Sequence, residues 1–227
     1  MDLEVLANAD AVARKGAAIV AAAARAAVAA RGRFVAALSG GQTPWIMLRA
    51  LAGEDVPWEV VHVVQVDERV APAGDADRNL THLRESLLAS APLRPDRLHA
   101  MPVEDGDLAA AAARYAALLQ ELAGAPAVLD LVHLGLGDDG HTASLVPGDP
   151  VLDVTDADVA LSGTYQGRRR MTLTYPVINR SRGILWVVTG GGKRAMLTRL
   201  SAGDSSIPAG RVRRDLALVL ADRAAAG

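Results

Sequence analysis

Six apolar runs alternate with Ala- and Leu-rich segments along the chain, and this alternation constrains the fold more than any other sequence feature. Strands that are apolar on both faces are typical of a parallel sheet covered by helices. We therefore predict an α/β fold with a mostly parallel, Rossmann-like open sheet flanked by helices. The expected strands are 34–39, 61–66, 97–103, 129–136, 184–190 and 216–220. The expected helices are 8–30, 44–52, 79–90, 107–123 and 192–202.

The composition limits the domain organisation and the partners. No internal repeat or low-complexity linker divides the 227 residues, so we expect one α/β domain over 1–227, with a small extra layer or a lid in the irregular stretch 149–183. The net charge of −2 provides no basic field for nucleic acid, and the 3% aromatic content leaves few stacking surfaces. The chain has no cysteine and no histidines at metal-ligand spacing, so no metal is expected.

The Ala-rich N-terminal stretch is expected to be the first helix. Acidic residues Asp2, Glu4 and Asp10 stand where a signal peptide would carry basic ones. Lys15 and Arg25 interrupt the apolar part well short of the roughly 20 residues of a membrane span. We therefore expect a cytoplasmic protein without a membrane partner.

Three polar motifs follow expected strands: SGGQTP at 39–44, DER at 67–69 and DDGH at 138–141. In open α/β sheets ligands bind beyond the carboxyl ends of the strands, so the motifs predict one shared site. In SGGQTP, Thr43 is a candidate N-cap and Pro44 a first helical residue, which would leave backbone amides free for an anion. An ordinary strand-to-helix turn explains the same residues.

The stretch GLGDDG matches the template of a dinucleotide-binding turn, but its aspartates argue against that reading. Asp138 and Asp139 would face a pyrophosphate, and like charges about 4 Å apart cost around 4 kcal/mol at an effective dielectric near 20. The motif is also a weak signal by itself. No nucleotide cofactor is therefore expected.

His141 is the candidate general base of this stretch. Imidazole has an ordinary pKa of about 6.5 and accepts protons at neutral pH. A turn histidine that caps the following helix is the alternative reading. No chemistry is assigned to the other histidines, which are His62, His82, His99 and His133.

Cations and polar residues near the other strand ends complete the candidate site. Asp67 is a candidate to orient a hydroxyl or an imidazole and Arg69 to bind a phosphate, with Glu68 on the opposite side; a surface ion pair is the alternative. Lys193 begins a helix after a strand, and its ammonium is a candidate to bind an anion in the site. A solvent-exposed helix lysine is the alternative. One of the three arginines at 168–170 is expected to point inward. Asn79 is explained equally well as a helix cap.

These motifs together resemble the 6-phosphogluconolactonase family, relatives of glucosamine-6-phosphate deaminase. They occur in the family's order as ALSGGQTP, DERV with Asn79, GLGDDGHTASLVPG, RMTLTYPVIN and VTGGGKRAML. Val146 departs from the pattern, because lactonases usually have an aromatic residue there.

The resemblance implies hydrolysis of 6-phospho-D-glucono-1,5-lactone to 6-phospho-D-gluconate. No cofactor is expected, and the oligomeric state is left open between a monomer and a homodimer. The resemblance makes His141 the base, supported by Asp139 and Asp67. It also implies a substrate-binding set that comprises Ser39, Gly40, Gly41, Gln42, Thr43, Arg69, Arg170 and Lys193.

Two other functions are considered. The sibling deaminase has an asparagine and a glutamate where this chain has Leu145 and Val146, which favours the lactonase. A non-catalytic phosphosugar-binding regulator is the second alternative, but the predicted α/β unit fills the 227 residues and leaves no room for a helix-turn-helix module.

Overall fold

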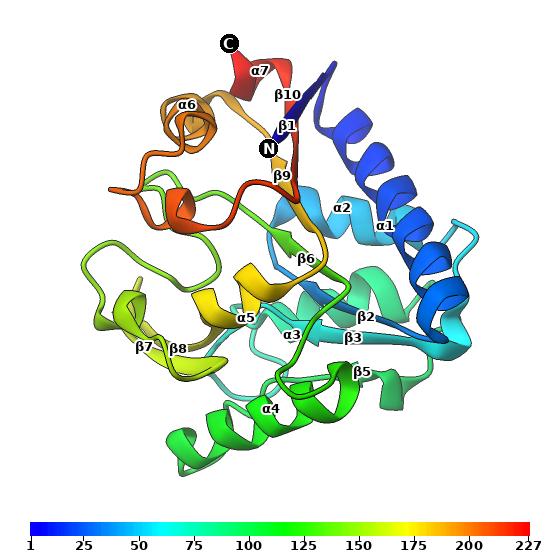
Figure 1. The fold of residues 1–227 in the computed structure, drawn as a ribbon, viewed down its shortest axis with the longest axis vertical. Helices are drawn as coiled ribbons and strands as arrows, with labels where there is room; N and C mark the ends of the chain where they lie inside the picture. The colour runs from blue at the N-terminus through cyan, green and yellow to red at the C-terminus, as the bar shows by residue number, and fades with distance from the viewer.

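The computed structural model describes residues 1–227 and is built around one parallel sheet (Figure 1). All its neighbouring strands are parallel, so the α/β prediction is confirmed. In spatial order the strands are β1 (Asp2–Leu6), β10 (Ala217–Asp222), β9 (Ile184–Val188), β6 (Leu131–Leu134), β2 (Phe34–Leu38), β3 (Val61–Gln65) and β5 (Leu98–His99).

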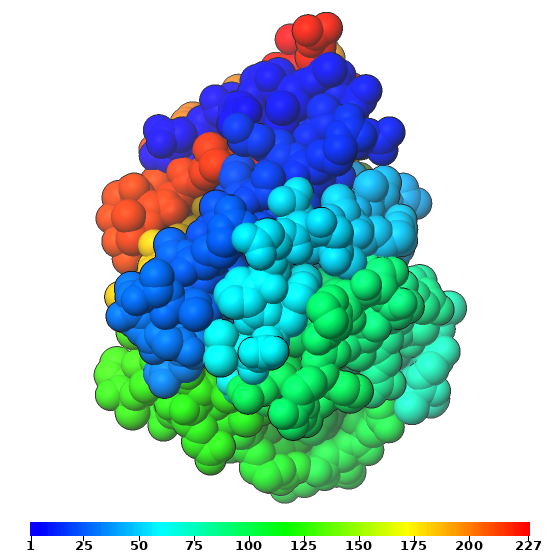
Figure 2. Space-filling view, turned by 90° about the vertical axis from the view of Figure 1, so that its right-hand side faces the viewer, coloured from blue at the N-terminus to red at the C-terminus, as the bar shows by residue number.

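Helices cover both faces of this sheet, and each face has its own apolar core. Helices α1 (Ala9–Arg31), α2 (Gln42–Leu51) and α3 (Asn79–Leu83) pack on one face. Figure 2 views this side, where α1 lies in dark blue across the molecule. The other face carries α4 (Leu108–Ala123), α5 (Tyr175–Arg180), α6 (Arg194–Ala202) and the short α7 (Arg223–Ala226). None of these helices combines the length and apolar character that a membrane span requires.

A second, antiparallel sheet adds the extra layer expected near 149–183. It consists of β4 (Asp67–Arg69), β8 (Arg168–Leu173) and β7 (Val159–Tyr165), in that order. Strands β7 and β8 form a hairpin whose two turn residues both have positive φ, 51° at Gln166 and 78° at Gly167. This backbone form matches the right-handed twist of paired strands. The small sheet therefore continues β3 through β4 and stands beside the ends of the parallel strands.

The predicted elements differ from the observed ones at several places. Edge strand β1 was missed, and the expected strand 97–103 is reduced to the two residues of β5. The strand ends early because side chains take its next hydrogen bonds. The Tyr115 hydroxyl accepts from the Gln65 N–H and donates to the His99 carbonyl, and the Met101 N–H donates to the Gln65 side chain. The five expected helices are present, although α3 continues at 84–88 as a wider helical turn.

The order of the strands fixes the place where a ligand can bind. From β2 the chain moves outward to β3 and β5, and then returns to β6 on the opposite side of β2. The segments that leave β2 and β6 consequently diverge and open a crevice at the carboxyl ends of these strands. SGGQTP follows β2 and DDGH follows β6, so both motifs border this crevice.

Candidate active site

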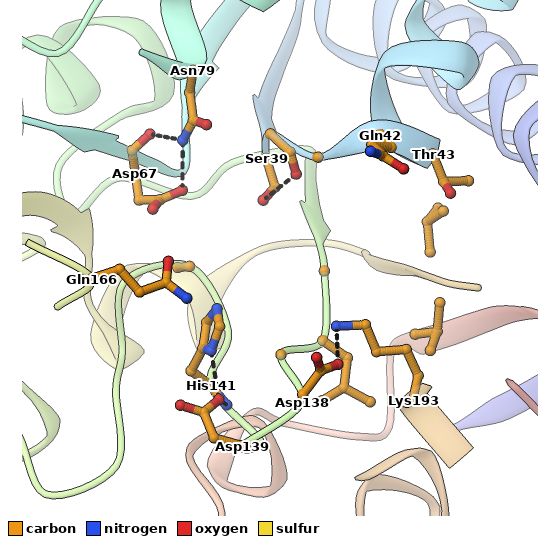
Figure 3. A pocket seen from close by; sticks show the side chains of 18 of the residues that line it. Ser39, Gln42, Thr43, Asp67, Asn79, Asp138, Asp139, His141, Gln166 and Lys193 are labelled. Carbon is orange, nitrogen blue, oxygen red and sulfur yellow. Dashed lines mark hydrogen bonds and ion pairs between the residues drawn. The ribbon is translucent and has the colours of Figure 1, made fainter. Parts of the chain in front are cut away.

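A cavity of about 690 Å³ lies at this crevice, and every residue predicted for the site lines it. These residues are Ser39, Gly40, Gly41, Gln42, Thr43, Asp67, Arg69, Asp139, His141, Arg170 and Lys193. Figure 3 shows the turn with Ser39, Gln42 and Thr43 facing the turn that carries Asp139 and His141. The structure thus brings the three motifs together, as expected.

The SGGQTP turn starts helix α2 without a side-chain cap. Gly41 is the N-cap with a φ of 127°, a conformation that favours glycine. The prediction of Thr43 as the N-cap is wrong, because the helix begins at Gln42 and the Thr43 hydroxyl is 2.6 Å from that of Thr189. Since no side chain accepts from the first N–H groups of the helix, they are available to an anion in the cavity.

The buried side chain of His133 hydrogen-bonds to the SGGQTP turn. His133 on β6 has no exposed surface, and its Nδ1 accepts a 3.3 Å hydrogen bond from the Ser39 N–H. Burial lowers the pKa of His133 to about 4, so the ring is neutral at physiological pH and can accept. The sequence assigned it no chemistry, because a histidine within an apolar strand looks the same whether or not it binds a turn.

His141 and Asp139 form a hydrogen-bonded pair on the turn after β6. Nδ1 of His141 lies 2.6 Å from Oδ1 of Asp139, which also accepts the His141 N–H at 3.0 Å. The turn is closed where Gly137 N–H donates to the His141 carbonyl at 2.8 Å. Gly137 also makes room for the imidazole, since a Cβ there would lie 2.0 Å from Nδ1.

The pairing determines which imidazole nitrogen is free. Burial opposes ionisation of Asp139, but hydrogen bonds from the His141 backbone and imidazole outweigh it and lower the pKa of Asp139. An ionised carboxylate only accepts hydrogen bonds, so His141 Nδ1 carries the proton. Nε2 is then unprotonated in neutral His141, and it points away from Asp139 into the cavity (Figure 3).

Asp67 contacts the His141 turn through Ser144 rather than through the imidazole. The Ser144 hydroxyl donates to Asp67 Oδ2 at 2.6 Å, and no hydrogen bond joins Asp67 to the imidazole of His141. Burial raises the pKa of Asp67, opposed by the Ser144 hydrogen bond and nearby Arg170. Asn79 is not a helix cap: its amide donates to Asp67, and its Oδ1 accepts from Arg69 at 3.3 Å.

Glu68 points away from the cavity, as predicted, but it is fully buried. Its carboxylate lies 3.1 Å from the guanidinium of Arg78 and accepts the N–H groups of Arg69, Asn79 and Leu80 at 2.8 Å each. The DER segment is therefore fixed from both sides, because Asp67 is bound by Ser144 and the Asn79 side chain while Glu68 is bound by Arg78 and the backbone at the start of α3.

Three cations reach the cavity from separate elements. Arg170 is the inward arginine of its run with 3% of its surface exposed, whereas Arg168 pairs with Asp75 and Asp77. Arg69 donates to the backbone of Asp77. The third cation is the ammonium of Lys193, which lies 2.6 Å from Oδ1 of Asp138. The expectation that one arginine points inward is confirmed.

The tip of the β7–β8 hairpin supplies lining residues that sequence reasoning missed. Tyr165 donates a 3.0 Å hydrogen bond to Asp139 Oδ2, and its hydroxyl lies 3.4 Å from His141 Nδ1. Gln166 accepts from Arg170 at 3.2 Å. A QG pair between two alternating segments was the available signal for the turn. It does not indicate which side chain reaches the cavity.

Comparison with known proteins gives the family. Residues 7–220 match the model described as glucosamine-6-phosphate isomerases/6-phosphogluconolactonase. The chain belongs to this family. A 6-phosphogluconolactonase from Mycobacterium tuberculosis is 40% identical over 215 residues, which cover 88% of this chain and 87% of the relative. A 6-phosphogluconolactonase from Nostoc sp. is 38% identical over 189 residues, covering 80% and 78%. The resemblance drawn from the five motifs is confirmed.

Solved structures have the same fold. The devB protein superposes with a TM-score of 0.86 at 26% identity, covering 99% of this chain and 98% of its own. A monomeric glucosamine-6-phosphate deaminase also reaches 0.86, at 20% identity, with 100% and 99% covered. A protein named as a deaminase therefore has the same architecture as this chain, and the fold alone does not show which reaction the chain catalyses.

Proposed function

We propose that this chain hydrolyses 6-phospho-D-glucono-1,5-lactone to 6-phospho-D-gluconate, with His141 as the general base. The relatives named 6-phosphogluconolactonase, at 36–40% identity, support the reaction. The observation that supports the mechanism is the hydrogen-bonded His141–Asp139 pair in the same cavity as the uncapped start of α2. An enzyme that hydrolyses a phosphorylated lactone needs a base to activate water and a binding site for the phosphate.

In this mechanism His141 Nε2 removes a proton from water as the water oxygen attacks the lactone carbonyl carbon. The tetrahedral intermediate then collapses, the ring C–O bond breaks, and the proton passes from the imidazolium to the departing oxygen. Asp139 keeps the proton on Nδ1 and stabilises the transient positive charge. A lactone is an activated ester, so a positioned base contributing about 10²–10⁴-fold suffices without a covalent intermediate.

The phosphate of the substrate is assigned to the other side of the cavity. The free amides after Gly41 provide backbone donors, and Arg69, Arg170 and Lys193 provide charge. A dianionic phosphate is a stronger partner for Lys193 than the exposed carboxylate of Asp138. Binding of the phosphate far from the reacting carbon would orient the lactone toward His141.

The deaminase alternative is disfavoured by the side chains that follow His141. Leu145 and Val146 replace the asparagine and glutamate of the deaminase pattern, and both are buried apolar residues with 0% and 8% exposure. No carboxylate follows His141 on this segment, so an acid for amine chemistry would have to come from elsewhere.

The experiment compares wild type with His141→Asn. We expect wild type to hydrolyse fresh lactone and to leave glucosamine 6-phosphate unchanged, after spontaneous hydrolysis is subtracted. His141→Asn should lose about 10²–10⁴-fold in turnover while binding 6-phosphogluconate as wild type does. An inert wild type that binds 6-phosphogluconate would instead support a phosphosugar-binding regulator. Near-normal turnover in His141→Asn would move the base role to another group.

A further inference from the structure

Tyr165 is the only side chain other than His141 that hydrogen-bonds the carboxylate of Asp139. Asp139 Oδ1 accepts both the backbone and the imidazole N–H of His141, and Oδ2 accepts the Tyr165 hydroxyl. The Asp139 side chain is 37% exposed, so without the second contact water would compete for it. The two contacts together fix the rotation of the carboxylate.

The hairpin places Tyr165 in this position by a local irregularity. Ser162 pairs with Arg170 and Tyr165 pairs with Arg168, so β7 has one more residue than β8 between these pairs. Such a bulge re-aims the side chain that follows it. The turn at Gln166 and Gly167 then reverses the chain immediately after Tyr165.

The tyrosine ring is held on two sides. The Arg170 guanidinium lies 5.0 Å from the ring centroid, and the His141 ring meets it edge-on at a centroid distance of 5.2 Å. Burial, followed by the hydrogen bond to Asp139, raises the pKa of Tyr165. The hydroxyl therefore keeps its proton at neutral pH and acts as a donor.

We propose that Tyr165 is a positioning residue for the reaction, which acts through Asp139 to hold His141 in the tautomer with a free Nε2. Loss of the hydroxyl would leave Asp139 Oδ2 to solvent and allow the carboxylate to turn away from Nδ1. The proposal rests on the proposed function, because it assumes that His141 is the base. Loss of the Tyr165 hydroxyl should lower kcat rather than raise KM, because the hydroxyl is hydrogen-bonded to Asp139 and not to the residues assigned to the phosphate.

The test removes only the hydroxyl, by Tyr165→Phe. Its matched control is Tyr175→Phe, because Tyr175 donates to the Pro208 carbonyl at 2.8 Å and does not line the cavity. We expect kcat for the lactone to fall roughly tenfold in Tyr165→Phe, the size of a hydrogen bond to a charged acceptor. KM should stay within twofold, and Tyr175→Phe should keep the wild-type kcat. In the Asp139→Asn background, Tyr165→Phe should change kcat less than twofold.

A second measurement does not depend on activity. Nitrogen-15 NMR of the His141 ring should report mainly the Nδ1–H form in wild type and a larger Nε2–H fraction in Tyr165→Phe. An unchanged tautomer ratio, an unchanged kcat, or an equal loss in the Asp139→Asn background would overturn the proposal. An inactive wild type with the expected tautomer shift would refute the proposed function and leave the positioning role intact.

Discussion

Gly137→Ala should disable the site while leaving the fold in place. An added Cβ would lie 2.0 Å from Nδ1, 2.3 Å from Cε1 and 2.7 Å from Cγ of His141. Ordinary contact begins at 3.4 Å, so the imidazole must move by about 1.4 Å (3.4 minus 2.0). That displacement is larger than the tolerance of the 2.6 Å hydrogen bond to Asp139.

The expected result is a large loss of turnover with little loss of stability. A misplacement of about 1 Å at a reacting group can reduce the rate about 10²-fold, and we expect at least this loss in kcat. The imidazole is 24% exposed, so it can rotate toward the cavity without disrupting a core. The thermal unfolding midpoint should therefore stay close to wild type.

Gly135→Ala is the matched control, because Gly135 follows the same strand and lines the same cavity, and an added Cβ there meets no atom within 4 Å. Both variants are assayed by acid release from fresh lactone in weak buffer, with spontaneous hydrolysis subtracted. A Gly137→Ala enzyme within threefold of wild type would refute the steric reasoning. An equal loss in Gly135→Ala would show that any methyl group at this strand end is harmful.

Two further predictions concern the phosphate contacts and His133. Lys193→Ala should raise KM for the phosphorylated lactone at least tenfold, because it removes a charge-assisted contact, and should leave hydrolysis of unphosphorylated gluconolactone within twofold. Burial lowers the pKa of His133 from 6.5 to about 4, so between these values the unfolded chain binds a proton that the folded chain does not. The free energy of unfolding should thus fall by up to about 3 kcal/mol as pH drops from 6.5 to 4. Urea titrations at several pH values should show that the free energy of unfolding falls more between pH 6.5 and 4 for wild type than for His133→Gln. The same pH dependence in both proteins would contradict this prediction.

The parallel sheet and the main motifs could be predicted because their signals are local. Apolar strands indicate a sheet that is buried on both faces. Polar residues that follow parallel strands lie together at the edge formed by the carboxyl ends of those strands. Strand β1 gave no such signal, since Asp2 and Glu4 interrupt an edge strand whose Leu3 and Val5 are nearly half exposed. Strand β7 was not predicted because it also lacks a continuous apolar run: four of its seven residues are polar or glycine.

The supporting contacts of the site could not be predicted, because they depend on tertiary register. Tyr165 reaches Asp139 only through the bulge in β7. Asp67 was expected to support His141, but its connection to the His141 turn runs through Ser144, to which the sequence analysis gave no role. Thr43 was misassigned because its hydroxyl is bound by Thr189, which lies 146 residues away in the sequence.

The residues that line the candidate site come from two different sheets. The turns with Gly41 and His141 extend from the parallel sheet, whereas Asp67, Tyr165 and Arg170 all belong to the added layer. Substitutions in the hairpin would therefore act on the Tyr165 contact to Asp139 and on Arg170 together, without altering the strands of the parallel sheet. Residues 159–173 are therefore the first segment to exchange when turnover is to be changed without disturbing the parallel sheet.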